Sequence, residues 1–178
     1  MLVLEPLDTA RQRGAEILAE ICGYGNSFDA HGISEPHPEG RGAVQAMERA
    51  LADARLRPDQ VDVVNAHGTA TPKNDPVESL AIKRVFGDHA RRLLVCATKS
   101  MIGHLISAAG AVEAVAAIVG LRGGWVHPTI NLDEPDAACD LDYVPHEARP
   151  CNGSVVLSNS FAFGGQNASI VLRRADAA

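Results

Sequence analysis

Short apolar runs alternate with amphipathic segments along the middle of the chain. Residues 61–66 and 93–97 are nearly continuous apolar runs, which are typical of strands buried on both faces of a parallel sheet. Residues 42–54 carry apolar side chains at helical spacing, and residues 77–86 follow an Asp-Pro pair that is typical of a helix start. This repeated order of strand, loop and helix predicts an α/β fold with flanking helices and a mixed, mostly parallel sheet.

The last third of the chain has a different pattern. Residues 155–160 and 168–172 are strand-like runs joined by a glycine-rich turn, which predicts an antiparallel pair at the edge of the sheet. Residues 105–121 form the longest apolar stretch, but they are built mainly from alanine, valine and glycine and contain Glu113. This composition favours a buried core helix over a membrane span.

The first residues predict strands that do not belong to this series. Residues 2–5 and 15–24 are strand-like and predict a hairpin-like pair, which a long loop at residues 25–38 follows. Because these strands precede the first repeated unit, we expect them to be the end of another sheet. The chain is therefore divided into a terminal strand pair at residues 1–30 and a second domain at residues 31–178.

Composition excludes several classes of function. Hydrophobic residues make up 46% of the 178 positions, which is enough for a globular core. The net charge of −6, without a basic stripe, argues against a nucleic-acid partner. No positively charged segment precedes an apolar run at the start, so we expect a cytoplasmic protein. The four cysteines form no C-x-x-C pair, so no metal site is expected.

Two histidines stand where secondary structure is predicted to change. His67 follows a predicted strand directly, and Gly68 and Thr69 after it leave space for a ligand and supply hydrogen bonds. His104 precedes the apolar helix, whose positive dipole end favours a neutral imidazole. A single histidine in such a place is structural about as often as functional. Two of them at the ends of neighbouring parallel strands favour a catalytic site.

Two charged residues lie in apolar surroundings. Lys99 ends an apolar run, and Glu113 lies inside the apolar helix. Each charge is costly to bury alone, so we expect the two side chains to form an ion pair. The alternative is that both reach solvent.

Two neutral imidazole donors aimed at one carbonyl oxygen are suited to stabilising an enolate, such as the one formed when a malonyl thioester loses CO2. A condensation also requires a thiolate activated at a helix N-terminus. Cys22 and Cys96 lie in strand-like runs, and Cys139 and Cys151 lie in loops that no helix follows. The chain therefore shows no credible nucleophile.

Four motifs resemble the condensing enzymes of the thiolase superfamily, most closely the bacterial β-ketoacyl-acyl-carrier-protein synthases and their polyketide relatives. These motifs are Asn65-Ala66-His67-Gly68-Thr69, residues 99–104, residues 128–132 and residues 159–165. The resemblance extends over residues 1–174 and implies the C-terminal half of a thiolase-like fold. The implied activity is that of an acyltransferase, which decarboxylates malonyl-acyl carrier protein and condenses it with an acyl thioester in fatty acid or polyketide synthesis.

The resemblance also implies roles for individual residues. It makes His67 and His104 the catalytic pair, Lys99 the residue that organises the site, and Glu113 its partner. The implied substrate-binding residues are Thr69 and Thr71, which contact the phosphopantetheine arm, and Phe161 and Phe163, of which Phe163 is the gate beside the acyl pocket. The loop at residues 26–36 is implied to be a mobile flap, with Asn26, Phe28, Asp29 and Ser34 as its gating residues.

This sequence departs from the family pattern in two ways. Ala162 stands where the family usually has glycine, and Gln166 where it usually has threonine, which predicts a less mobile gate. The family's enzymes are longer, and they carry the nucleophilic cysteine in an N-terminal half that this sequence lacks.

The expected partners are an N-terminal ketosynthase half or subunit that supplies the cysteine, and the acyl carrier protein whose phosphopantetheine carries the substrates. No tightly bound cofactor is expected. We also expect the chain to form a homo- or hetero-oligomer, since the apolar helix and the first strands need further layers to pack against. Two alternatives remain open: a non-condensing subunit that resembles a chain-length factor or binds acyl chains, and a stand-alone malonyl-thioester decarboxylase. Retention of His67, Lys99 and His104 argues against the first.

Overall fold

A five-stranded sheet with the strand order β1-β7-β6-β2-β3 forms the centre of the computed structural model, which describes residues 2–175. Its strands are β1 (Glu20–Phe28), β2 (Val63–Asn65), β3 (Leu94–Cys96), β6 (Val155–Ala162) and β7 (Gln166–Arg173). A separate two-stranded sheet consists of β4 (Trp125–Val126) and β5 (Arg149–Pro150). Met1 and residues 176–178, the two ends of the predicted division, lie outside the described residues.

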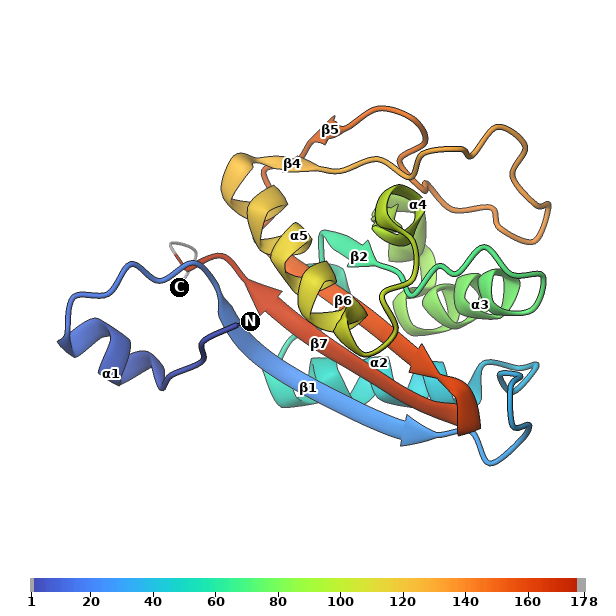
Figure 1. Cartoon of the computed structure of the whole chain (residues 1–178), viewed down its shortest axis with the longest axis horizontal. Coiled ribbons are helices and arrows are strands. Elements are labelled where there is room, and N and C mark those ends of the chain that lie inside the picture. The colour runs from blue at the N-terminus through green and yellow to red at the C-terminus, as the bar shows by residue number, and fades with distance from the viewer. Residues whose placement is uncertain (1, 176–178) are drawn as a thin grey trace.

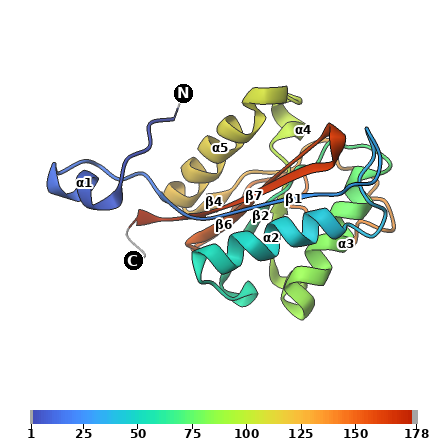
Figure 2. The ribbon, with the colours of Figure 1, turned by 90° about the horizontal axis from the view of Figure 1, so that it is seen from below.

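Helices cover the sheet on both faces (Figures 1 and 2). Helices α2 (Arg41–Ala54) and α3 (Asn74–Phe86) lie against one face, and α5 (Ala109–Gly123) lies against the other. The shorter elements are α1 (Leu7–Gln12), α4 (Lys99–Ile102) and the 3-10 turns Pro58–Gln60, Gly87–Arg92, Ile106–Ala108 and Phe163–Gly165. The result is a three-layer α/β arrangement, and the predicted fold class is confirmed.

The directions of the strands confirm the mostly parallel sheet. Strand β2 is parallel to both β3 and β6, whereas β7 is antiparallel to both β6 and β1. Among these five strands only β7 therefore runs in the opposite direction. The antiparallel pair at the edge is β1–β7, because β1 occupies the outer side of β7 and leaves β6 inside the sheet.

The start of the chain differs from the prediction. Residues 2–5 form no strand, and the second predicted strand begins at Glu20 and continues to Phe28. A strand needs a neighbour for its backbone N–H and C=O groups, and β1 finds that neighbour in β7 rather than at residues 2–5. Asn26 and Phe28, which were predicted in a loop, consequently lie in a strand. The division at residue 30 stays a prediction.

Strand residues alternate between two hydrophobic cores. Val64 of β2 and Leu157 of β6 face the core under α2 and α3, whereas their neighbours Val63 and Val156 face the core under α5. Strand β1 lies so close to α2 that a Cβ atom at Gly25 would be 2.1 Å from the carbonyl oxygen of Ala46. The two layers can approach to this distance only because glycine has no side chain.

Helix α5 is buried on one side only. The predicted helix is confirmed, but Val112, Val115 and Val119 on its outer side are exposed. The stretch Ile106–Gly123 is long and apolar enough to cross a membrane by length and composition, a test that core helices of soluble proteins also pass. Tyr24 and Phe28 of β1 are exposed as well. These apolar groups form a surface that a further protein layer would cover.

We expect the purified chain to self-associate through the exposed face of α5, because burying Val115 and Val119 removes apolar area from water. Sedimentation velocity should show dimers or larger species that shift toward the monomer in the variant Val119→Lys. The control is Ile33→Lys, which adds the same charge at an exposed apolar residue of a loop. A monodisperse monomer of the unaltered chain would contradict this expectation.

Candidate active site

The ends of β2 and β3 position the first two site residues. The two strands are parallel and paired in register, with Asn65 opposite Cys96, so that the segments after them leave the sheet at the same edge. His67 lies two residues beyond the end of β2. Lys99 lies three residues beyond the end of β3, as the first residue of α4. The sheet therefore brings together two residues that are 32 positions apart in the sequence.

A buried carboxylate on α3 holds the segment that carries His67. The backbone N–H of His67 donates to Oε1 of Glu78 over 2.8 Å, and the N–H of Gly68 donates to Oε2 over 2.9 Å. The side-chain amides of Asn159 and Asn74 donate to the same carboxylate over 3.1 and 3.3 Å. Burial raises the pKa of Glu78, and these donors counteract that rise.

Sequence reasoning missed Glu78. A usable signal was present, because Glu78 is three and four positions before Ala81 and Ile82, both of which are fully buried on α3. A charged residue on the apolar face of a helix requires a partner, and here the partners are backbone N–H groups of the loop after β2.

Gly68 allows the loops after β2 and β3 to touch. Its φ of +45° lies in the left-handed region, and a Cβ atom there would be 2.8 Å from the Cβ of Ala97. The next residues, Thr69 and Thr71, form a hydrogen bond of 3.0 Å between their hydroxyl groups, with Ala70 at a φ of +56° between them. The small residues after His67 therefore permit a tight turn beside the site.

Three aromatic rings meet around His67. The rings of His67 and His104 lie edge to face, with their centroids 5.5 Å apart and an interplanar angle of 83°. The ring of Phe161, at the end of β6, lies 5.4 Å from that of His67 on centroids. The expectation that the two histidines lie near each other is confirmed.

His67 is held in its neutral form. Burial, together with the positive charge of Lys99 and the neighbouring His104, lowers the pKa of His67 to about 3. Its Nδ1 atom is buried and has no hydrogen-bond partner among residues 2–175. His104 is exposed, and its Nδ1 atom accepts a hydrogen bond of 3.0 Å from the backbone N–H of Ile106. A neutral His104 ring therefore carries its proton on Nε2, where it can serve as a donor.

Lys99 and Glu113 form the ion pair expected from the sequence. The Lys99 Nζ atom lies 2.5 Å from Oε1 of Glu113, and the two side chains are only 4% and 2% exposed. The prediction is confirmed, and the alternative in which both reach solvent is wrong. The second carboxylate oxygen of Glu113 has no hydrogen-bond partner within the described chain. Glu113 therefore joins α5 to the segment after β3.

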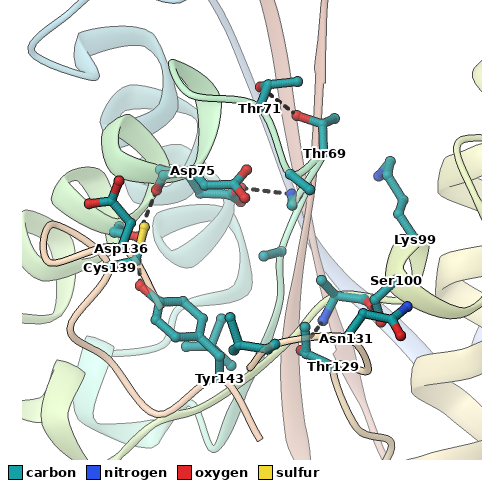
Figure 3. A pocket seen from close by; sticks show the side chains of 18 of the residues that line it. Thr69, Thr71, Asp75, Lys99, Ser100, Thr129, Asn131, Asp136, Cys139 and Tyr143 are labelled. Carbon is teal, nitrogen blue, oxygen red and sulfur yellow. Dashed lines mark hydrogen bonds between the residues drawn. The ribbon is translucent and has the colours of Figure 1, made fainter. Parts of the chain in front are cut away.

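A cavity of about 660 Å³ opens beside these residues (Figure 3). Thr69, Thr71, Lys99 and His104 are among the residues that line it. Tyr143 also lines it, and its hydroxyl group lies 2.6 Å from that of the buried Ser79. A cavity of this size accommodates a small organic ligand, with the predicted substrate-binding threonines at one end.

The predicted gating residues are found in two places. Asp29 lies after β1, where its N–H donates to the carbonyl oxygen of Gly165 over 2.7 Å. Gly165 belongs to the turn Phe163–Gly165. A second hydrogen bond joins this turn to the loop after β1, because the N–H of Gly164 donates to the carbonyl oxygen of Ile33 over 2.5 Å. Phe163, in this turn, is 79% exposed. Backbone hydrogen bonds thus connect the predicted flap with the predicted gate.

Of the other gating residues, Asn26 and Phe28 lie in β1, and Ser34 lies in the same loop as Asp29. Asn26 and Phe28 pair with Ala168 and Gln166 of β7 and line a separate hollow on the sheet. Ser34 is exposed in the loop between β1 and α2. The mobility of this loop stays a prediction.

Three of the four cysteines lie in surroundings that disfavour the thiolate. Burial raises the pKa of the Cys22, Cys96 and Cys139 thiols above the ordinary value, and Cys96 is almost fully excluded from water. All four cysteines are free thiols. Within residues 2–175, no group of three or more His, Cys, Asp or Glu side chains is placed to hold a metal ion.

The neutral His67 should make folding stability depend on pH. Its pKa is about 3 in the folded chain and 6.5 when unperturbed, so the unfolded state alone binds this proton between those values. This contribution is fully present above pH 6.5 and is lost as the pH falls toward 3, by up to about 1.4 kcal/mol per pH unit. In urea unfolding, the free energy of unfolding should fall less between pH 6.5 and pH 4.5 in His67→Phe than in the unaltered chain. His146→Asn, which changes an exposed ring, should behave as the unaltered chain does.

Removing one member of the buried ion pair should destabilise the fold strongly. In Lys99→Met, Glu113 is left buried without its counter-charge, and we expect a loss of about 3–5 kcal/mol in the free energy of unfolding. The double variant Lys99→Met/Glu113→Leu should recover most of this loss. Lys73→Met, which breaks an exposed ion pair with Glu35, should cost less than about 1 kcal/mol. Additive losses in the double variant would show that the two side chains act independently.

Comparisons with known proteins show which family this chain is similar to. The family described as "Beta-ketoacyl synthase, C-terminal domain" matches residues 18–133. The 3-oxoacyl-acyl-carrier-protein synthase 2 of Coxiella burnetii is 50% identical over 173 residues, which cover 97% of this chain and 42% of that protein. The chain therefore spans less than half the length of this relative.

Solved structures show the same relationship. A type II polyketide ketosynthase, described in complex with its acyl-carrier protein, has a TM-score of 0.94 and 38% identity, over 97% of this chain and 42% of that one. The ishigamide ketosynthase/chain length factor has a TM-score of 0.89 and 40% identity, over 94% of this chain and 41% of that one. With the matched family covering most of its residues, the chain belongs to the β-ketoacyl synthases, of which it represents the C-terminal, thiolase-like half.

Proposed function

We propose that this chain is the enolate-forming half of a β-ketoacyl-acyl-carrier-protein synthase, and that it becomes a complete condensing enzyme when an N-terminal half supplies the nucleophilic cysteine. The observation that carries this proposal is the edge-to-face pair of His67 and His104, 5.5 Å apart on centroids, beside the buried Lys99–Glu113 pair. A structural role alone does not require two imidazole rings in contact, one of which lines a cavity.

The two histidines suit the first step, decarboxylation of a malonyl thioester. The bond between the malonyl carboxylate and the α-carbon breaks, CO2 leaves, and the electron pair passes to the thioester as an enolate. The developing charge lies on the thioester oxygen, where two neutral N–H donors stabilise it without bringing a formal charge. The low pKa of His67 supports this role, because the ring stays neutral at any physiological pH.

The second step needs the missing half. The enolate carbon attacks the carbonyl of an acyl group held as a thioester, the new C–C bond forms, and the C–S bond breaks to release the cysteine thiolate. Cys22, Cys96 and Cys139 do not suit that role, because burial raises the pKa of their thiols. Cys151 is followed by β6 and not by a helix whose N-terminus could stabilise a thiolate. The exposed outer side of α5, with Val112, Val115 and Val119, supports docking of such a half against this face.

The cavity supports a carrier-bound substrate. Thr69, Thr71 and His104 line it, and the two threonine hydroxyls can hold a phosphopantetheine arm delivered by an acyl carrier protein. Phe161, beside the His67 ring, and the exposed Phe163 would border the acyl group, with the loop of Asp29 and Ser34 as the gate. The polyketide relative described with its acyl-carrier protein is consistent with such a partner.

Reconstitution tests this function. The chain is mixed with the N-terminal half of a matching synthase, and both CO2 release from malonyl-acyl carrier protein and formation of the condensed product are measured. We expect condensation by the complex and a loss of about 100-fold or more with His67→Ala, since one donor to the oxyanion is removed. The control, His146→Asn, should keep full activity.

The outcomes separate the alternatives. A complex that forms but does not condense would contradict the proposal. Activity that His67→Ala leaves unchanged would indicate a partner subunit like the chain length factors, a role compatible with the ishigamide relative. CO2 release by the isolated chain, without condensation in the complex, would indicate a malonyl-thioester decarboxylase.

A further inference from the structure

His127 is a buried histidine to which the proposed reaction gives no role. It follows β4 and is only 6% exposed. Its Nε2 atom lies 2.9 Å from the hydroxyl of Thr98, and its Nδ1 atom lies 3.1 Å from the carbonyl oxygen of Pro128. Thr98 is the residue immediately before Lys99, so His127 contacts the segment that carries the buried lysine.

The residues that follow His127 form hydrogen bonds with the same segment around Lys99. The hydroxyl of Thr129 accepts a hydrogen bond of 3.1 Å from the backbone N–H of Ala97. The hydroxyl of Ser100 accepts one of 3.0 Å from the backbone N–H of Ile130. Residues 127–130 thus contact residues on both sides of Lys99. At Ala97 and Ser100 these contacts use side-chain hydroxyl groups and not the backbone pairs of a β-sheet.

The backbone carbonyl of Pro128 determines which ring nitrogen of His127 carries a proton. The carbonyl oxygen of Pro128 can only accept, so Nδ1 of His127 must carry a proton. A neutral ring then has an unprotonated Nε2, which accepts the hydroxyl proton of Thr98. The Thr98 hydroxyl has a second acceptor within hydrogen-bond distance, the amide oxygen of Asn65 at 3.1 Å, and it has only one proton to donate. That amide oxygen also accepts from the thiol of Cys96 at 3.8 Å, which leaves the Thr98 proton available to Nε2 of His127.

Charge in this region favours the neutral ring. Burial lowers the pKa of His127, while the Pro128 carbonyl and the Glu113 carboxylate act in the opposite direction. Lys99 already pairs with Glu113 at 2.5 Å. A second buried cation would compete with Lys99 for that carboxylate, whereas a neutral His127 leaves the pair intact.

We propose that His127 is a positioning residue for Lys99. Its neutral ring carries the proton on Nδ1, and its Nε2 accepts a hydrogen bond from the Thr98 hydroxyl, which fixes the start of α4. The consequence for catalysis rests on the proposed function, in which Lys99 organises the site. The structural part of the proposal does not rest on it.

The first experiment uses the chain alone and needs no activity. Two-bond 1H–15N correlation spectra at pH 7 assign the tautomer of each imidazole, and we expect Nδ1 of His127 to be protonated and Nε2 unprotonated. A protonated Nε2, in either the neutral or the charged ring, would overturn the assignment. The ammonium resonance of Lys99, protected from exchange by burial and pairing, reports whether the segment after β3 is held.

Two variants of similar size separate positioning from packing. His127→Gln places an amide oxygen near the Nε2 position, where it can accept from Thr98, whereas His127→Leu fills the space without an acceptor. We expect the protected Lys99 resonance to persist in His127→Gln and to be lost or broadened in His127→Leu. Equal behaviour of the two variants, at equal stability in urea, would overturn the proposal.

The reconstituted enzyme supplies the catalytic readout. Misplacement of Lys99 should lower kcat for malonyl decarboxylation by roughly 10-fold or more in His127→Leu, with KM little changed and recovery in His127→Gln. His146→Asn again serves as the control. If the unaltered complex is inactive, the proposed function fails while the spectra still decide the role of His127. Unaltered kcat in His127→Leu, with a displaced Lys99 signal, would overturn the link to catalysis.

Discussion

The site depends on the buried ion pair between Lys99 and Glu113. Lys99 follows β3, and Glu113 lies on α5, which covers the sheet from the other side, so the pair fixes the distance between a strand end and a helix. Each charge alone would cost several kcal/mol in this environment, and neither position tolerates its residue without the other. His104 lies in the linker between α4 and α5. The pair joins the first residue of α4 to the fifth residue of α5, so it restricts where this linker can lie.

A second buried carboxylate acts from the opposite face. Glu78 on α3 accepts hydrogen bonds from the backbone of His67 and Gly68, and so holds the loop after β2 as Glu113 holds the segment after β3. Each helical layer therefore contributes one carboxylate to one strand end. The two histidines approach each other because these anchors lie on opposite sides of the same sheet edge, with β2 and β3 as the rigid connection between them.

The surfaces around this core are not self-sufficient. Helix α5 buries its alanine side and leaves Val112, Val115 and Val119 in water, and β1 leaves Tyr24 and Phe28 exposed. Polar groups inside the site are also incompletely paired within the described residues, since Nδ1 of His67 and Oε2 of Glu113 have no partner there. Exposed apolar side chains of this kind are typical of a surface that another protein layer covers. The chain spans less than half the length of its relative from Coxiella burnetii.

The local hydrophobic pattern was sufficient to predict the repeated units of strand, loop and helix, because hydrophobic periodicity and helix capping depend on residues only a few positions apart. The helices at residues 41–54 and 74–86, the short strands before His67 and Lys99, and the antiparallel pair at the end of the chain could all be predicted from hydrophobic spacing. The Lys99–Glu113 pair could be predicted too, since a charge inside an apolar element has few alternatives. The start of the chain could not, because β1 pairs with residues of β7 that lie 138 to 153 positions later, and no local signal specifies a partner at that distance.

The amino-acid sequence by itself thus determined the fold class and the family. It also singled out the two histidines and the lysine as candidate site residues, because these inferences depend on residue type and short-range spacing. Only the tertiary structure decided that Glu78 anchors His67, that His127 lies against Thr98, and that Asn26 and Phe28 belong to a strand and not to the predicted loop. In each of these cases the deciding contact is a hydrogen bond between segments far apart in the chain, and its geometry exists only after the sheet has assembled.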